Sequence, residues 1–335
     1  VDSLPDGPDP DEYLCPIADG PRVGSALGRK IRCWRAAQET IAREGRPGDV
    51  LWVRELPTAA FAIPALTRWL PGRRELVYLY DVASIVELEM GLSTDVRASG
   101  AKRFVEAWMR RRFDRVRTLG DGMRDVLVAR GVDPERIVVA PVGTDLPARR
   151  HVPRGRLERA LYIGSNERWQ GLPVLIEAMR RLHARGAAGR LTVAGAAPDS
   201  FEGQELPSNV DVIGWVDRVG IAELYVEHDL FVIPRPRTPL TDTVIPMKAV
   251  EAQGFGIPML ASDLGALREV TGGESAMLVP PDDPDAIVAA FERIAADPEA
   301  LQLLHEAAVA RAPAWTWPVI GARLAEALFG VERPR

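Results

Sequence analysis

Short apolar runs recur along this chain, and segments with apolar residues at helical spacing lie between most of them. A strand buried on both faces needs such a run, so the pattern predicts parallel sheets. The strands predicted in the first half of the chain are residues 49–54, 75–80, 115–119 and 136–141. The helices predicted there are residues 24–44, 59–70, 99–113 and 122–130. Alternating strands and helices predict a right-handed, doubly wound α/β fold.

A second series of the same kind follows. Its predicted strands are residues 161–164, 190–195, 210–215, 230–234, 258–262 and 276–279. Its predicted helices are residues 172–184, 221–227, 247–253 and 284–295. Residues 147–158 are rich in Arg and Pro without an apolar period, which is typical of a linker. We therefore expect two Rossmann-like domains, residues 1–146 and 159–312, that face each other across a ligand cleft.

Charge and composition exclude several functional classes. The net charge of −5 gives no basic field for nucleic acid, so we expect no nucleic-acid partner. Two cysteines and four histidines without ligand spacing predict no metal site. No apolar run approaches the ~18 residues of a spanning helix, and no leader is evident, so a cytoplasmic protein is expected. Without a G-x-G-x-x-G or G-x-x-x-x-G-K-[ST] motif after a strand, we expect no nicotinamide or flavin cofactor and no P-loop.

The second series of predicted strands and helices contains three sequence motifs. The loop after its first strand reads IGSNERWQG (163–171) and is followed by LIEA (175–178). The sequence PMKAVEAQGFGIP (246–258) runs into ASDLG (261–265), and residues 274–281 read ESAMLVPP. Together they resemble the donor half of GT-B fold glycosyltransferases of the retaining family 4, or group 1, type. The resemblance implies a GT-B fold, a nucleotide-diphosphate-sugar donor, and sugar transfer with retention and without a metal.

Lys248 and Glu251 are the strongest candidates for donor chemistry. Three residues apart, they share one face of a helix near its N-terminus, where free backbone amides and the helix dipole attract phosphate. Lys248 adds a cation for the leaving diphosphate, and the Glu251 carboxylate can accept both hydroxyls of a ribose. Thr243, Val244 and Ile245 are expected to offer backbone amides just before the helix. The same spacing also suits an i, i+3 surface salt bridge.

The chain departs from the family in the glycine loop. Gly164 opens the loop, but the family's Arg and Lys fall on Ser165 and Gln170. Arg168, inside the loop, can reach the same phosphates and is a candidate catalytic cation, although a loop arginine without a ligand is usually only solvated. The first glutamate of the family's E-x7-E pair falls on Thr243.

The acceptor side is expected in the first domain. Many family members end a strand there with a His-Asp pair, and this chain has Tyr80 and Asp81. Asp81 is a candidate catalytic residue, while Tyr80 is an acceptor-side candidate or a core-edge aromatic. Arg54, at the end of the preceding predicted strand, is a second acceptor-side candidate. The family's opening strand and glycine-rich loop are not evident before residue 49, which indicates that this unit lies upstream or has been lost.

The resemblance also implies that residues 313–335 form a helix that crosses back to the first domain. We expect transfer from a nucleotide-diphosphate sugar to an acceptor sugar, a lipid-linked sugar or a small molecule. The basic predicted helix at residues 103–117 can contact the inner face of an anionic membrane, or simply pack one face and solvate the other.

Two alternatives to transfer stay open. One is a catalytically inactive nucleotide-sugar binder, because several family positions are substituted. The substituted positions are Ser165, Gln170, Thr243 and Tyr80. The other, more remote, is a sugar-nucleotide epimerase, which needs carboxylates and histidines around the cleft. The four histidines fall instead in the linker or at predicted helix ends, at His151, His183, His228 and His305.

Overall fold

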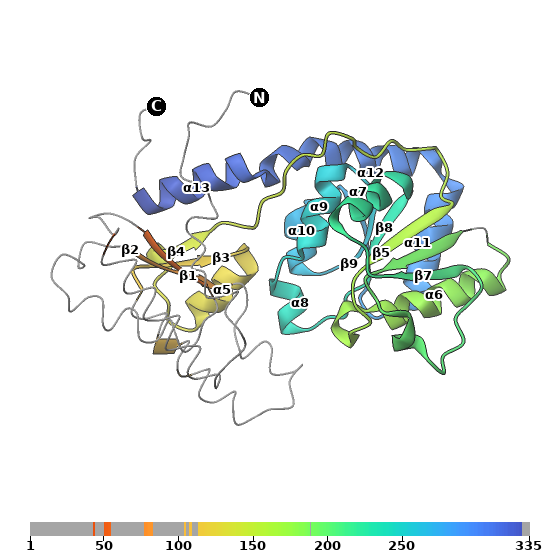
Figure 1. Ribbon diagram of the computed structural model, residues 1–335, viewed down its shortest axis with the longest axis horizontal. Helices are drawn as coiled ribbons and strands as arrows, with labels where there is room; N and C mark the ends of the chain where they lie inside the picture. The colour runs from red at the N-terminus through yellow and green to blue at the C-terminus, as the bar shows by residue number, and fades with distance from the viewer. Residues whose placement is uncertain are drawn as a thin grey trace. The chain divides into compact units, whose positions relative to one another are not determined.

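The computed structural model of the protein is an α/β structure with two sheets (Figure 1). The residues that it describes are 43, 50–54, 77–82, 104, 107–108, 113–187 and 189–329. Contacts divide the chain into two compact units, whose boundaries follow Arg117, Gly131 and Ile137. The helices predicted at residues 24–44, 59–70 and 99–113 lie wholly or mostly outside the described residues.

The first sheet has four strands in the order β1-β2-β3-β4. Their bounds are β1 Val50–Arg54, β2 Val77–Val82, β3 Arg115–Thr118 and β4 Ile137–Val139, and helix α5 (Asp121–Ala129) follows β3. Strands β1 and β2 are parallel, with Arg54 opposite Asp81. β2 ends two residues later than predicted, because Val82 continues the buried run beyond the polar Asp81. Tyr80 and Asp81 therefore lie within the strand rather than at its end.

The second sheet has six parallel strands in the order β10-β9-β8-β5-β6-β7. Their bounds are β5 Arg159–Ile163, β6 Arg190–Ala194, β7 Val210–Gly214, β8 Leu230–Ile233, β9 Met259–Ser262 and β10 Ala276–Val279. From β5 the chain moves outward through β6 and β7, and from β8 it moves outward the other way. The strand order therefore reverses between β5 and β8, and the loops after these two strands border the crevice where doubly wound sheets bind ligands.

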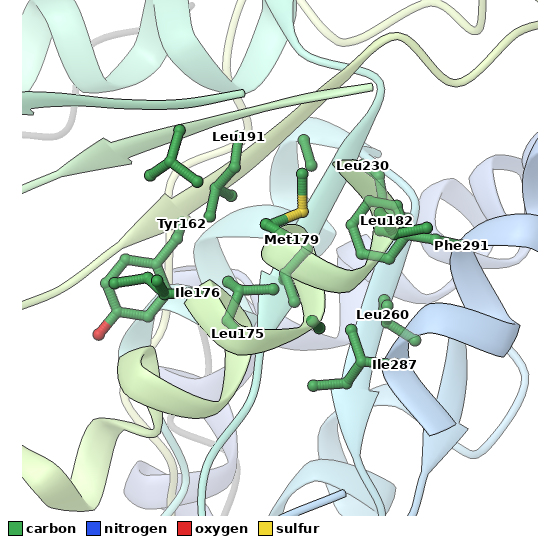
Figure 2. Close-up of a cluster of buried hydrophobic side chains, with 14 of the residues drawn as sticks. Tyr162, Leu175, Ile176, Met179, Leu182, Leu191, Leu230, Leu260, Ile287 and Phe291 are labelled. Carbon is green, nitrogen blue, oxygen red and sulfur yellow. The ribbon is translucent and has the colours of Figure 1, made fainter. Parts of the chain in front are cut away.

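Helices cover both faces of this sheet (Figure 1). On one face lie α6 (Leu172–Ala184) and α11 (Pro284–Ala296), whose buried side chains share one core with Ala160 and Tyr162 of β5. Figure 2 shows Tyr162 in this core. The other face carries α7 (Arg218–Glu227), α9 (Met247–Phe255) and α10 (Gly265–Thr271), which meet Leu161 and Ile163. Alternate residues of one strand thus serve two cores, as the continuous apolar runs predict. The α/β class with parallel strands that the sequence predicts is therefore confirmed.

The remaining helices were not all foreseen. The short α8 (Pro239–Thr243) begins at a capping box formed by Thr238 and Thr241, and α12 (Pro298–Arg311) follows α11. The last helix, α13 (Trp317–Phe329), places Ile320 in a cluster with Val138 and Ala140. The assignment of residues 147–158 as an interdomain linker and of residues 313–335 as a crossover stays a prediction. Among the described helices, none is both long and apolar enough to cross a membrane.

Candidate functional site

Two loops meet where the strand order of the second sheet reverses. The first follows β5, runs from Gly164 to Gly171 and contains a single 3-10 turn, η4 (Arg168–Gln170). The second follows β8 and begins at Pro234. Gly171 has φ +77°, and a Cβ there would overlap the carbonyl oxygen of Pro234. The two loops are therefore packed backbone to backbone, and only glycine suits position 171.

Helix α9 brings Lys248 and Glu251 to the same place. It starts after Pro246, and no side chain caps its N-terminus. The Tyr225 hydroxyl lies 3.3 Å from Oε2 of Glu251 and 3.3 Å from the carbonyl oxygen of Lys248. Tyr225 is fully buried and stacks on Phe255, with ring centroids 4.9 Å apart. A rigid aromatic side chain therefore fixes the position of the Glu251 carboxylate.

The two charged side chains of α9 are partly buried. Burial lowers the pKa of Lys248, and the positive charge of Arg235 lowers it further, while Glu251 acts in the opposite direction. Burial also raises the pKa of Glu251, against the hydrogen bond from Tyr225 and the charge of Lys248. Among the described residues, Lys248 and Glu251 form no ion pair within 4.0 Å, so the surface salt bridge that their spacing also suits is not formed.

Arg235 is a site residue that the sequence analysis missed. It stands in the loop after β8 and is only 9% exposed. Its guanidinium carbon lies 5.0 Å from the ring centroid of Trp169, and one terminal nitrogen lies 3.5 Å from Oε1 of Gln170. Burial lowers the pKa of Arg235 to about 10. Its position directly after a predicted strand was the one signal in the sequence that could have drawn attention to it.

The remaining donor candidates, all in the glycine loop, differ in their hydrogen bonds and exposure. The carbonyl oxygen of Ser165 accepts a hydrogen bond from the Tyr162 hydroxyl at 2.8 Å, and the Gly164 amide donates to Ala194 at 2.9 Å. Gln170 contacts Arg235, as described above. Arg168 is exposed, in the same 3-10 turn. Arg235 thus links the glycine loop, through Gln170, to Lys248 of α9, while the Arg168 side chain is exposed.

The segment before α9 offers fewer free amides than expected. The Val244 amide donates to the carbonyl oxygen of Leu240 at 2.9 Å, closing the last turn of α8, so it is not available to a ligand. The Thr243 hydroxyl donates to Pro239 at 2.7 Å. The Ile245 side chain is buried in the core. The expectation of an open amide at Val244 is therefore wrong, because α8 uses that group.

Asp242 also has a structural role. One carboxylate oxygen accepts the Gly265 amide at 2.8 Å and faces Arg237 at 3.1 Å. The carboxylate thereby ties α8 to the start of α10. Asp242 does not stand in for the glutamate that the family has beside it.

The acceptor-side candidates are described only through their backbones. Arg54 and Asp81 are paired across β1 and β2, and Tyr80 precedes Asp81 in β2. Their side chains lie outside the description, so their roles stay predictions. The basic segment at residues 103–117 is described only in part, and its contact with a membrane likewise stays a prediction.

Three of the four histidines lie within hydrogen-bond distance of a neighbouring group, while both ring nitrogens of His151 are buried without a hydrogen-bond partner among the described residues. His228 contacts the Leu224 carbonyl oxygen and the Thr192 hydroxyl, each at 2.8 Å, and His305 contacts the Gly256 carbonyl oxygen at 2.6 Å. His183 lies 3.3 Å from the Ser208 hydroxyl, and His151 is buried. In the described part of the chain, no group of three or more His, Cys, Asp or Glu side chains is placed to hold a metal.

Comparisons with known proteins agree with this architecture. Residues 158–297 match the family model of the group 1 glycosyl transferases, and residues 7–143 match a glycosyl transferase 4-like domain. A D-inositol 3-phosphate glycosyltransferase of Geodermatophilus obscurus is 30% identical over 229 residues, which are 60% of this chain and 49% of that protein. A glycogen synthase of Mycobacterium tuberculosis is 26% identical over 241 residues, 68% of this chain and 57% of that protein.

The chain spans about half the length of the curated relatives that it matches. Among solved structures, Anabaena HepE in complex with UDP superposes with a TM-score of 0.71 at 16% identity, over 91% of this chain and 82% of that one. This similarity shows the fold. Together with the two family models, which match both halves of the sequence, it identifies the chain as a member of the GT-B glycosyltransferases of the group 1 type.

Proposed function

We propose that this protein transfers a sugar from a nucleotide-diphosphate donor, bound at the crevice of the second sheet, to an acceptor. The observation that carries the proposal is the placement of Lys248 and Glu251 on the first turns of α9, with Lys248 near Arg235, which contacts Gln170 of the loop after β5. An uncapped helix N-terminus with a lysine attracts phosphate. A carboxylate one turn further on, held by Tyr225, can accept the hydroxyls of a ribose.

The proposed chemistry is stabilisation of the leaving group. As the bond between the sugar and the diphosphate breaks, negative charge grows on the departing phosphate oxygen. Lys248 is placed to neutralise that charge, and groups fixed before the reaction stabilise it most effectively. Retention of configuration and independence of metal follow from the family resemblance. The HepE complex contains UDP, which supports a nucleotide donor but leaves the base and the sugar open.

The acceptor stays open in this proposal. The names of the two relatives point to different acceptors, an inositol phosphate and a glucan. We also propose that Asp81, Tyr80 and Arg54 contribute to the acceptor site and that the protein binds peripherally at the inner face of the membrane.

A first experiment separates transfer from simple binding. Thermal unfolding with UDP-, GDP- and ADP-sugars selects the donor, because a ligand that binds the native state raises the midpoint of unfolding. Turnover of the selected donor is then measured with sugar, lipid-linked and small-molecule acceptors, with Lys248→Ala as the control for contaminating activity. Transfer that is lost in Lys248→Ala supports the proposal.

The inactive binder is the second candidate, and a specific observation favours it. The family's loop cations are replaced by Ser165 and Gln170, and the side chain of Arg168 is exposed. Tight binding of a nucleotide sugar with neither transfer nor slow hydrolysis would establish this alternative.

A further inference from the structure

Arg235 is a buried cation with no anion beside it. Its side chain is almost fully enclosed, its Nε atom has no hydrogen-bond partner, and it forms no ion pair with any carboxylate of the described chain. The Gln170 oxygen, at 3.5 Å, is at the limit of hydrogen-bond distance. A buried charge that lacks a counterion destabilises a protein by several kcal/mol. Such a group points to an anion that binds from outside the chain.

The surroundings of Arg235 add positive charge rather than remove it. Lys248 lies close enough that the charge of Arg235 lowers its pKa. The nearby Tyr162 cannot serve as the counterion, because burial raises the pKa of its phenol and keeps it neutral. The Tyr162 hydroxyl instead donates to Ser165. Two neighbouring cations, from the loop after β8 and from α9, therefore lie close together near the point where the strand order reverses.

The Arg235 side chain is held in place before any ligand arrives. The ring of Trp169 packs against the guanidinium, which is a favourable cation–π arrangement. The close packing of the Gly171 backbone against Pro234 fixes the two loops that carry Trp169 and Arg235. A preorganised guanidinium loses little conformational freedom on binding an anion.

We propose that Arg235 binds the diphosphate of the nucleotide together with Lys248, and that it supplies the cation missing from the glycine loop at Ser165 and Gln170. This inference rests on the proposed function and names the residue on which its donor binding depends. The planar guanidinium presents paired N–H donors that match phosphate oxygens, and it stays charged in spite of its burial. Arg168, which is exposed, is not needed for this role.

A purely structural role for Arg235 makes a different prediction. If the side chain only connects Trp169 and Gln170, its removal lowers the stability of the ligand-free protein and leaves the affinity of the folded fraction unchanged. If it is a phosphate ligand, its removal relieves an unpaired buried charge, so the ligand-free protein keeps its stability and loses affinity for phosphate.

The test is calorimetric titration of the full chain with UDP, GDP, ADP and inorganic pyrophosphate, with the nucleosides as probes that lack phosphate. In Arg235→Gln we expect affinity for the diphosphate that binds best to fall about tenfold or more, with nucleoside affinity unchanged. Arg190→Gln is the matched control. Arg190 is the first residue of β6, so it lies at the amino ends of the strands, away from the loops that follow their carboxyl ends, and it pairs with Asp211. Arg235→Lys, which keeps the charge without the planar fork, should retain intermediate affinity.

The outcomes separate this inference from the proposed function. If the wild-type protein binds no nucleoside diphosphate and no pyrophosphate, the proposed function itself fails. If the wild type binds and Arg235→Gln binds equally well, only the role of Arg235 is overturned. Should Arg235→Gln not fold, Arg235→Lys decides: affinity equal to the wild type's overturns the role, and reduced affinity with unchanged unfolding temperature supports it.

Discussion

The hydroxyl of Tyr225 lies 3.3 Å from Oε2 of Glu251, within a stack of buried aromatic rings. It joins the aromatic core under α9 to the carboxylate proposed to bind the ribose. Replacing Tyr225 with Phe keeps the ring and removes the hydrogen bond. We expect nucleotide affinity to fall by about 0.5–1.5 kcal/mol, because the carboxylate loses its orientation. Titration of the variant with nucleoside diphosphate checks this, and unchanged affinity would show that Tyr225 does not position Glu251.

Glu251→Gln should weaken nucleotide binding by roughly 1–3 kcal/mol, the scale for a hydrogen bond to a charged group. The wild-type affinity should also depend on pH. Burial raises the pKa of Glu251, so protonation begins at a higher pH than for an ordinary glutamate, and affinity falls as the pH is lowered through that raised pKa. In Glu251→Gln, nucleotide affinity should no longer fall as the pH is lowered. If the affinity of the variant still falls, another group is responsible for the pH dependence.

Lys248→Ala should lower kcat by about 10² or more, because the lysine is proposed to act on charge that develops in the transition state. Burial and the charge of Arg235 lower the pKa of Lys248, so activity should decline as the pH rises through that lowered value and the cation is lost. Arg168→Gln should have a smaller effect, since Arg168 is exposed. A rise in KM alone for Lys248→Ala would make the lysine a ground-state anchor.

Gly171→Ala should destabilise the second unit strongly. A non-glycine residue at positive φ costs about 1–3 kcal/mol, and here the added Cβ would also overlap the Pro234 carbonyl oxygen. Gly186→Ala is the matched control, because Gly186 has φ +69° with open space around its Cβ position. Urea unfolding should show a clearly larger loss for Gly171→Ala than for Gly186→Ala. Equal losses would mean that the two loops can separate.

His151 should make the protein sensitive to acid. The side chain is 1% exposed, and burial lowers its pKa from 6.5 to about 4, with a smaller contribution from His305. Between these values the unfolded chain binds a proton that the native state does not, so stability falls as the pH drops below 6.5. The loss reaches up to about 3 kcal/mol near pH 4.

Chemical unfolding at pH 7 and pH 5 tests the assignment to His151. His151→Gln should lose less stability over this interval than the wild type, because glutamine does not titrate. His183→Gln, at an exposed histidine, should behave as the wild type does. The same acid dependence in all three proteins would exclude His151 as its source.

The sequence predicts the second sheet well because each strand has to fill two cores. All six strands of that sheet were expected, within one or two residues at their ends. β2 was placed two residues early, since the polar pair Tyr80 and Asp81 interrupts an apolar run that Val82 continues. The five residues of α8 depend on a capping box rather than on an apolar period, so periodicity did not reveal them.

The candidate site was predictable only where chemistry follows local spacing. Lys248 and Glu251 are one helical turn apart, and a sequence shows such a pair directly. Arg235 depends on which two loops meet in space, and strand order is not visible in a sequence. The occupied amide of Val244 has the same cause, because it is bonded to a helix that the pattern did not indicate.

The reversal of strand order between β5 and β8 also has a consequence for folding. Ala160 pairs with Leu230, so the two loops of the crevice come together only after the chain has closed across the whole β6, β7 and α7 segment. Closing so long a loop lowers the conformational entropy of the chain before the contacts between the two loops can stabilise the closed state. During synthesis, a chain that has not yet emerged beyond residue 233 has its glycine loop but no partner loop. The proposed diphosphate site is therefore completed late, and nucleotide binding would report completion of the second sheet.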